Sequence, residues 1–230
     1  MSTVLFIPDL HIPAVHPLAL EHVISLKKQI KPNYVVFGGD IFDLHRASFH
    51  AHDPDMPSLT DELKTCKEMV RHWIDAFPKA KICNSNHDDR IKRVARSVGL
   101  PDSVVKSQHA IFDLPDTWEF ADDFIIDGVR YSHGMDCKGG AGGAYASVMK
   151  HRRSQVYGHW HTFAGITWTA TEHDLLFGFN AGALCDVEHM AMRYGKWFVN
   201  KPIIGAGVII EGMYPQFYPI NLGSKIKYID

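Results

Sequence analysis

The chain has few cysteines, and their spacing excludes two common uses of cysteine. Cys66, Cys83, Cys137 and Cys185 are widely separated, and none belongs to a C-x-x-C pair. A thiolate zinc site or a disulfide framework needs cysteines that are clustered or regularly spaced. We therefore predict four free thiols in a protein of a reducing compartment.

Long hydrophobic runs are also absent. No window reaches the roughly 18 uninterrupted apolar residues of a membrane span. The N-terminal MSTVLFIPDLH lacks the basic region and the long apolar core of a signal peptide. We therefore expect a soluble, cytoplasmic protein with no membrane partner.

The chain has no large excess of charge of either sign. Its formal net charge is -2 at pH 7, so no overall positive field attracts nucleic acid, although a local basic groove is compatible with that total. With 46% hydrophobic and 22% charged residues, the composition is that of an ordinary globular protein. The length of 230 residues predicts a single domain over residues 1–230.

Strand and helix signals alternate in the first half of the chain. Apolar runs predict strands at residues 4–7, 34–37 and 79–83. Periodic apolar positions predict helices at residues 17–30, 58–77 and 88–98. Ser58 and Asp61 resemble a capping box at the start of the second helix, and Gly99 suits the end of the third. The alternation predicts a mostly parallel sheet.

The second half is richer in strand signals. Apolar runs at residues 124–126 and 129–132 flank Asp127-Gly128, which is a two-residue hairpin signal. Further strands are predicted at residues 155–157, 165–169, 175–179 and 207–210. The stretch from 44 to 57 is polar and rich in proline, and it is predicted to be a loop.

Five polar clusters follow directly after predicted strands. They are Asp9-Leu10-His11, Gly39-Asp40-Ile41-Phe42-Asp43, Asn86-His87-Asp88, Ser132-His133-Gly134 and Gly158-His159-Trp160-His161. In open α/β sheets, ligands bind beyond the carboxyl ends of the strands, so clusters from distant parts of the chain are expected to converge there. Taken singly, any of the fifteen histidines is more often structural than a ligand. Their shared position at strand ends is what singles these out.

The pooled side chains are carboxylates, one amide oxygen and several imidazoles. This mixture suits borderline divalent metals, and it suits neither calcium nor a thiolate zinc site. D-x-H and H-x-H put two donors on the same side of an extended segment. There are too many donors for one tetrahedral ion, whereas two ions that share a carboxylate would use them all.

In this order, the clusters resemble the motifs of the calcineurin-like metallophosphoesterases. That family has D-x-H, G-D-x-x-D, G-N-H-D/E, a histidine and G-H-x-H in sequence, and the match covers residues 9 to 161. The resemblance implies an α/β fold in which two mixed β-sheets pack as a sandwich flanked by helices. It also implies a dinuclear site of divalent transition-metal ions, with Mn²⁺ first and Fe, Zn or Ni as other possibilities.

The resemblance also implies individual roles. Seven residues would hold the two metals: Asp9, His11 and His161 on one, Asn86, His133 and His159 on the other, and Asp40 between them. His87 would stand beside the phosphate with Asp88 as its orienting partner. We expect Asp43 to form hydrogen bonds to the ligands rather than to bind metal. Ser85 departs from the family pattern, which has glycine there, so the local turn is expected to differ slightly.

The reaction implied is hydrolysis of a phosphate ester by metal-activated water. The stretch GGDIFD is similar to the repair-nuclease and other diesterase branches, which favours a phosphodiesterase acting on nucleic acid or a nucleotide. A phosphomonoesterase acting on a nucleotide, phosphoprotein or small metabolite is the alternative. A catalytically inactive scaffold is the second alternative, and the complete set of ligands argues against it.

Two segments are candidates for contact with the substrate. His45 and Arg46 follow the second motif, with His50 and His52 beyond them, and Arg90 follows the third. A solvated loop is the simpler interpretation of residues 44–57; the alternative is a rim that faces the substrate, and on that alternative His45, Arg46 and Arg90 are the candidates for substrate binding. The second candidate segment lies near the C-terminal end, where basic and aromatic residues are interleaved as in some nucleic-acid contacts. A plain solvated surface is the simpler interpretation of this segment. Its basic and aromatic residues are Arg193, Tyr194, Lys196, Trp197 and Lys201.

Overall fold

The structure is a computed structural model that describes residues 2–49, 54–195 and 199–220. Its first sheet has the strand order β11-β10-β1-β2-β3-β4. The strands are β1 (Thr3–Ile7), β2 (Tyr34–Phe37), β3 (Ala80–Cys83), β4 (Trp118–Ala121), β10 (Gly205–Ile210) and β11 (Tyr214–Pro219). The strands β1 to β4 run parallel, and β10 and β11 are antiparallel additions at one edge.

The second sheet has the order β5-β6-β7-β9-β8. Its strands are β5 (Asp123–Ile126), β6 (Val129–Ser132), β7 (Gln155–Tyr157), β8 (Ala164–Ala170) and β9 (Leu175–Ala181). The central strands β6, β7 and β9 are parallel, and the edge strands pair antiparallel. Asp127 and Gly128 both have positive φ, as the hairpin between β5 and β6 requires.

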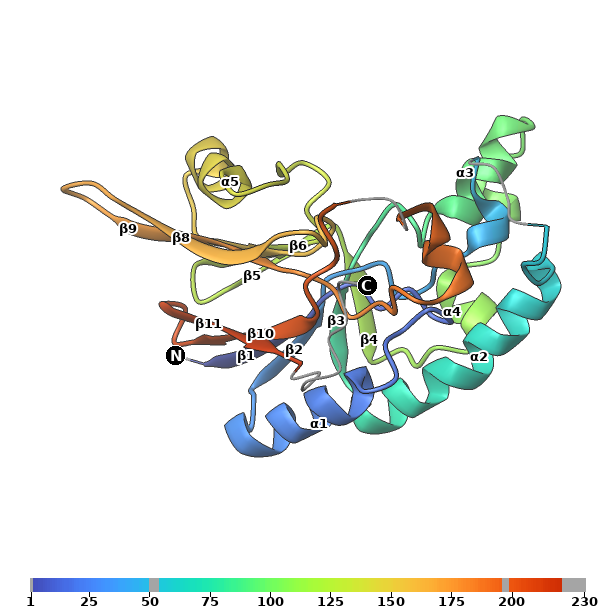
Figure 1. Ribbon diagram of the computed structural model, residues 1–230, viewed down its shortest axis with the longest axis horizontal. Helices are drawn as coiled ribbons and strands as arrows, with labels where there is room; N and C mark the ends of the chain where they lie inside the picture. The colour runs from blue at the N-terminus through green and yellow to red at the C-terminus, as the bar shows by residue number, and fades with distance from the viewer. Residues whose placement is uncertain (1, 50–53, 196–198, 221–230) are drawn as a thin grey trace.

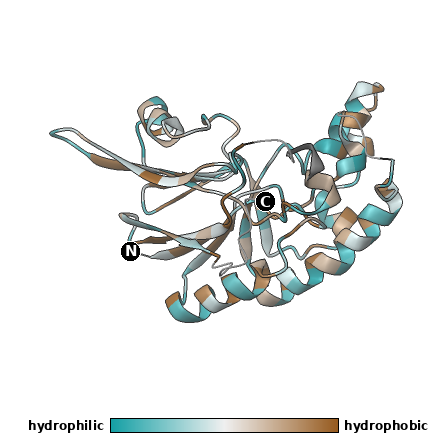
Figure 2. Cartoon of the chain, in the orientation of Figure 1, coloured by the Kyte–Doolittle hydropathy of each residue, from teal (hydrophilic) through white to brown (hydrophobic). Residues whose placement is uncertain are grey.

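Helices cover the outer faces of both sheets. The helices α1 (Ala19–Ile30) and α2 (Leu59–Ala76) lie against the first sheet, and α5 (Gly143–His151) lies over the second (Figure 1). Both α1 and α2 carry hydrophilic and hydrophobic residues in alternation, as helices with one buried side do (Figure 2). Short helices complete the fold: α3 (Arg90–Ser97), α4 (Gln108–Phe112), and the 3-10 turns η1 (His45–Ala47), η2 (Asp102–Val104) and η3 (Met190–Gly195).

Alternation along β1 shows how the layers are held together. Leu5 and Ile7 belong to the core beneath α1 and α2, whereas Val4 and Phe6 face the second sheet and pack with residues such as Phe179. Successive strand residues point to opposite faces, so one strand serves two cores. The architecture expected from the resemblance, two mixed sheets packed face to face and flanked by helices, is therefore confirmed.

Most predicted elements are confirmed to within two residues at each end. Ser58 is the N-cap of α2, and its hydroxyl accepts the N–H of Asp61. Gly99 has a φ of +82° after α3. The predicted loop 44–57 contains the short turn η1, while His50 and His52 lie outside the described residues. The elements α4, α5, β4 and β11 were not predicted.

The expected free thiols are also confirmed, because all four cysteines are buried without a disulfide. In the part of the chain that the structure describes, no helix has the length and apolar character to cross a membrane.

Candidate metal centre

All five predicted clusters meet where parallel strands of the two sheets end. The first three follow β1, β2 and β3, and the other two follow β6 and β7. One close approach depends on glycine: a Cβ on Gly158 would lie 2.1 Å from Oδ1 of Asp9. The loop after β7 can therefore lie directly on the loop after β1, which brings the two sheets' donors together.

The first donor group consists of Asp9, His11, Asp40 and His161, whose ligand atoms all lie within 4.8 Å of one another. The Nε2 atoms of His11 and His161 face each other at 3.4 Å. Nε2 of His161 is also 2.8 Å from Oδ2 of Asp9. These atoms come from β1, β2 and β7 and enclose a single small volume.

The second donor group consists of Asp40, His133 and His159. Nδ1 of His159 lies 3.1 Å from Nε2 of His133. The amide oxygen of Asn86 lies 2.8 Å from the same His133 nitrogen, so Asn86 belongs to this group as well. Asp40 is common to both groups.

The two carboxylate oxygens of Asp40 face the two groups separately. Oδ2 is 3.6 Å from Nε2 of His11, and Oδ1 is 3.4 Å from Nε2 of His133. The Asp40 side chain is almost wholly buried. A carboxylate in this position is suited to join two cations.

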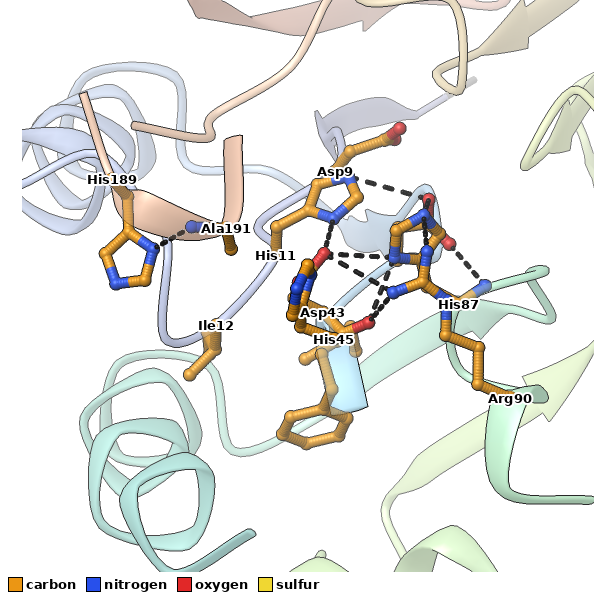
Figure 3. A network of polar contacts seen from close by, with 12 residues as sticks. Asp9, His11, Ile12, Asp43, His45, His87, Arg90, His189 and Ala191 are labelled. Atoms are coloured by element: carbon orange, nitrogen blue, oxygen red, sulfur yellow. Dashed lines mark hydrogen bonds and ion pairs between the residues drawn. The ribbon is translucent and has the colours of Figure 1, made fainter. Parts of the chain in front are cut away.

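Hydrogen bonds at the far nitrogens orient two of the imidazoles. Nδ1 of His133 lies 2.8 Å from the carbonyl oxygen of Gly38. Nδ1 of His11 lies 3.0 Å from Oδ1 of Asp43 (Figure 3). If each Nδ1 donates its hydrogen there, each Nε2 presents a lone pair to the site. Metal-bound histidines are held by carbonyls and carboxylates in the same way.

The donor set fits a pair of divalent cations. Oδ1 of Asp9 is buried and has no hydrogen-bond partner, which is costly for a carboxylate unless a cation lies nearby. Imidazole nitrogens that face one another at 3.1 and 3.4 Å likewise suit a shared positive charge. The mixture of imidazole and carboxylate is that of Mn, Fe, Zn or Ni sites.

Burial and mutual charge shift the pKa values of Asp40 and His159 towards the forms that bind metal. Burial by itself would raise the pKa of Asp40, but His133, His87 and His11 outweigh it and hold that pKa below its ordinary value. Burial and the neighbouring His133 lower the pKa of His159 to about 4. The carboxylate anion and the neutral imidazole are the forms that bind metal. The pKa of His161, in contrast, is raised, because its burial is outweighed by the hydrogen bond to Asp9 and by the nearby Cys185.

Three of the predicted ligands have a backbone conformation that side chains other than glycine rarely adopt. The φ values are 53° for His11, 46° for Asp40 and 65° for His159. Each such residue costs on the order of 1–3 kcal/mol, and such residues cluster at functional sites. The strain at these positions is a second, independent observation that singles out these residues as a candidate site.

The contacts of His87 differ from those expected. Its Nδ1 lies 3.1 Å from both the carbonyl oxygen and Oδ1 of Asp43, and its Nε2 lies 3.0 Å from Nη2 of Arg90 (Figure 3). The predicted pairing with Asp88 is wrong, because the Asp88 carboxylate points elsewhere. Asp43 is the residue that orients His87.

Asp88 supports the backbone that carries Asp40. Its carboxylate accepts the N–H groups of Ile41 and Phe42, at 3.3 and 3.1 Å, and the hydroxyl of Ser85 at 2.7 Å. The same hydroxyl accepts the N–H of Asp40 at 2.8 Å. Ser85, which replaces the family's glycine, does not adopt a positive φ. Its hydroxyl joins the second and third motifs.

We therefore expect Asp88→Asn to disturb Asp40 rather than proton transfer. The new amide group would face N–H donors, and leaving a buried group unsatisfied costs about 1–3 kcal/mol. The melting temperature and turnover should both fall, and turnover should fall equally for good and poor leaving groups. Asp89→Asn is the matched control, because the described hydrogen bond of that carboxylate is to Arg96. If turnover falls only for substrates with poor leaving groups, Asp88 takes part in proton transfer after all.

Of the three predicted candidates for substrate binding, Arg90 and His45 lie near Asp43, whereas Arg46 contacts its own loop. Arg90 lies at the site, because its guanidinium donates to the Asp43 carbonyl and contacts His87. Nδ1 of His45 is 3.9 Å from Oδ2 of Asp43. The guanidinium of Arg46, in contrast, donates to the carbonyls of Met56 and Pro57, so it is engaged in holding its own loop.

The later basic and aromatic segment is only partly described. Lys201 lies among the described residues, whereas Lys196, Trp197 and the side chains of Arg193 and Tyr194 lie outside them. Glu62 was missed by sequence reasoning. It is buried on α2 and accepts the N–H groups of His45 and Arg46 at 2.7 and 3.2 Å. The sequence does hold a sign of this role, because Glu62 lies on the same face of α2 as the buried Cys66 and Val70.

Comparison with protein-family models gave no match, and neither did comparison with curated proteins. Among solved structures, the chain is similar to Yfce, a phosphoesterase from E. coli, with 15% identity, a TM-score of 0.40, and coverage of 90% of this chain and 88% of that one. Vacuolar Protein Sorting 29 from Cryptosporidium parvum has 14% identity, a TM-score of 0.46, and coverage of 94% and 97%. The nuclease MPE from Pseudomonas putida has 12% identity, a TM-score of 0.39, and coverage of 94% and 87%. Because the TM-scores are below 0.5, the functional case rests on the residues of the site.

Proposed function

We propose that the chain is a phosphoesterase that depends on two divalent transition-metal ions, with Mn²⁺ as the first candidate, and that it cleaves phosphodiesters of nucleic acid or nucleotides. The observation that carries this proposal is the position of Asp40, whose two oxygens face two separate groups of donors. Asp9, His11 and His161 would hold one ion, and Asn86, His133 and His159 the other. When bound, the ions supply an activated water and neutralise charge on the phosphoryl oxygens.

The remaining side chains act on the substrate. Arg90 presents a guanidinium beside the donors, where it can pair with a phosphoryl oxygen. His87 holds its Nδ1 hydrogen against the Asp43 carbonyl and directs Nε2 towards the site. The oxygen of the leaving alcohol needs a proton, and we assign that donation to Nε2 of the doubly protonated His87 imidazole, after Arg90 has turned from it to the substrate. Asp43 keeps the imidazoles of His11 and His87 in position at the same time.

Metal dependence is the first test of this function. Stripping the protein of metal should abolish turnover, and Mn²⁺ should restore it better than Mg²⁺, because Mg²⁺ prefers oxygen ligands and holds its waters tightly. The measurement is hydrolysis of p-nitrophenyl phosphate and of bis-p-nitrophenyl phosphate across a series of metals, alongside metal content. We expect the diester to be cleaved at least as well as the monoester.

Each alternative has its own result in the same experiment. Monoester cleavage without diester cleavage would support a phosphomonoesterase. Two bound metals without turnover on either ester would support a scaffold. Full turnover after exhaustive chelation would contradict the metal-dependent function itself.

A further inference from the structure

The tryptophan of the last motif is more exposed than the histidines on either side of it. Trp160 stands between His159 and His161, and 38% of its surface is exposed. Its ring lies edge to face with that of His159, with the two centroids 5.0 Å apart. A large aromatic side chain therefore borders the second donor group.

The loop before α5 fits closely around this indole. A Cβ on Gly139 would lie 2.5 Å from Cε3 and 2.8 Å from Cδ2 of Trp160, so only glycine allows the backbone to lie against the ring. The Gly139 backbone covers one side of the indole and His159 borders another. The exposed part of the ring therefore lies away from Gly139, on an indole that contacts His159.

The backbone of Trp160 is fixed as well. Its N–H donates to the carbonyl of Gly158 at 2.7 Å, and its carbonyl accepts from Nδ2 of the buried Asn180 at 2.9 Å. An aromatic ring held on a rigid backbone loses little conformational freedom when a second ring stacks on it.

We propose that Trp160 is a stacking platform for the base of a nucleotide-type phosphodiester. This inference rests on the proposed function. Anything that stacks on Trp160 while its phosphate occupies the donor groups must carry a flat, apolar ring close to that phosphate, and a nucleobase is the common group of this kind. Stacking on an aromatic side chain tolerates any base, so the site selects for a base without selecting its sequence.

The test compares two esters that share a leaving group. They are the p-nitrophenyl ester of thymidine 5′-phosphate, which carries a base, and p-nitrophenyl ethyl phosphate, which does not. In Trp160→Ala, the ratio of kcat/KM for the first to kcat/KM for the second should fall about 5- to 150-fold. Trp160→Phe should retain most of the ratio, because phenylalanine also stacks. Gly139→Ala should lower it, because the new Cβ displaces the indole.

Trp168→Ala is the matched control. This tryptophan is 45% exposed on β8 and contacts Phe177, outside the donor groups, so its loss should leave the ratio unchanged. An unchanged ratio in Trp160→Ala, or an equal loss on both esters, would overturn the proposal and leave Trp160 as an anchor for the loop before α5.

Binding separates failure of this proposal from failure of the proposed function. Calorimetry should show thymidine 5′-monophosphate binding more tightly than inorganic phosphate to the wild-type protein and to Trp160→Phe. In Trp160→Ala, the two affinities should become similar. If the wild-type protein hydrolyses neither ester, the proposed function fails and the binding comparison still decides on Trp160. Equal affinities for nucleotide and phosphate in the wild type would contradict the stacking platform.

Discussion

Asp40→Asn should lower both the metal content and the turnover of this protein, the latter by about 10³-fold or more. Asp40 directs one oxygen to His11 and the other to His133, and among the described residues it is the one carboxylate that belongs to both donor groups. An amide has nearly the same shape and no charge, and it cannot hold two divalent ions near each other. Losing several kcal/mol of charge stabilisation corresponds to this loss of rate.

The substitution tests charge with little change in backbone. Asp40 has a φ of 46°, and asparagine tolerates this left-handed conformation as well as aspartate does. Asp113→Asn is the matched control, since Asp113 is also left-handed, at a φ of 54°, and pairs with Lys67 at the surface. Metal content by elemental analysis and turnover with Mn²⁺ are the measurements. Two bound ions in Asp40→Asn would show that Asp40 is not the bridge.

Elements with one dominant local signal could be predicted from the sequence. The apolar stripe and the Ser58 cap predict α2, and Asp127-Gly128 predicts the hairpin between β5 and β6. The helix α5 follows a run of glycines that hides its periodicity, and it depends on packing over the second sheet. The strand β11 contains Pro215 and Pro219, and proline has a low intrinsic propensity for strands. As the edge strand of its sheet it tolerates them.

The sequence was enough to predict which donor side chains come together. It was not enough to predict which residues these side chains contact. The order of the motifs gathers the ligands because each follows a parallel strand, whose end is fixed by topology. The partner of His87 depends on side-chain direction instead. Asp88 is its neighbour in sequence but turns to the amides of Ile41 and Phe42, and Asp43 reaches His87 from the adjacent strand end. Sequence adjacency gave no information about this choice.

His87→Gln should keep the metals and the fold but slow turnover by about 10² to 10⁴-fold, the usual contribution of a general acid. The contact between Nε2 and Arg90 sharpens this expectation. While Arg90 donates to Nε2, that nitrogen cannot donate to a leaving group. Proton donation by His87 therefore requires the guanidinium to turn to another acceptor, for which a phosphoryl oxygen of the substrate is suited, and requires Nε2 to take up a proton from water before it gives one to the leaving group.

The leaving group distinguishes this role from the alternatives. A p-nitrophenolate leaving group needs little protonation, whereas an alkoxide needs a proton because of its high pKa, so His87→Gln should harm alkyl esters more than p-nitrophenyl esters. Arg90→Ala should instead raise KM for alkyl esters and p-nitrophenyl esters alike, since Arg90 would contact the phosphate group that both kinds of substrate share. His109→Gln is the matched control, because that imidazole contacts the Trp118 carbonyl outside the site and should change neither. If His87→Gln slows both leaving groups equally, His87 acts on the phosphoryl charge rather than as an acid; if it loses metal as Asp40→Asn does, His87 is a ligand.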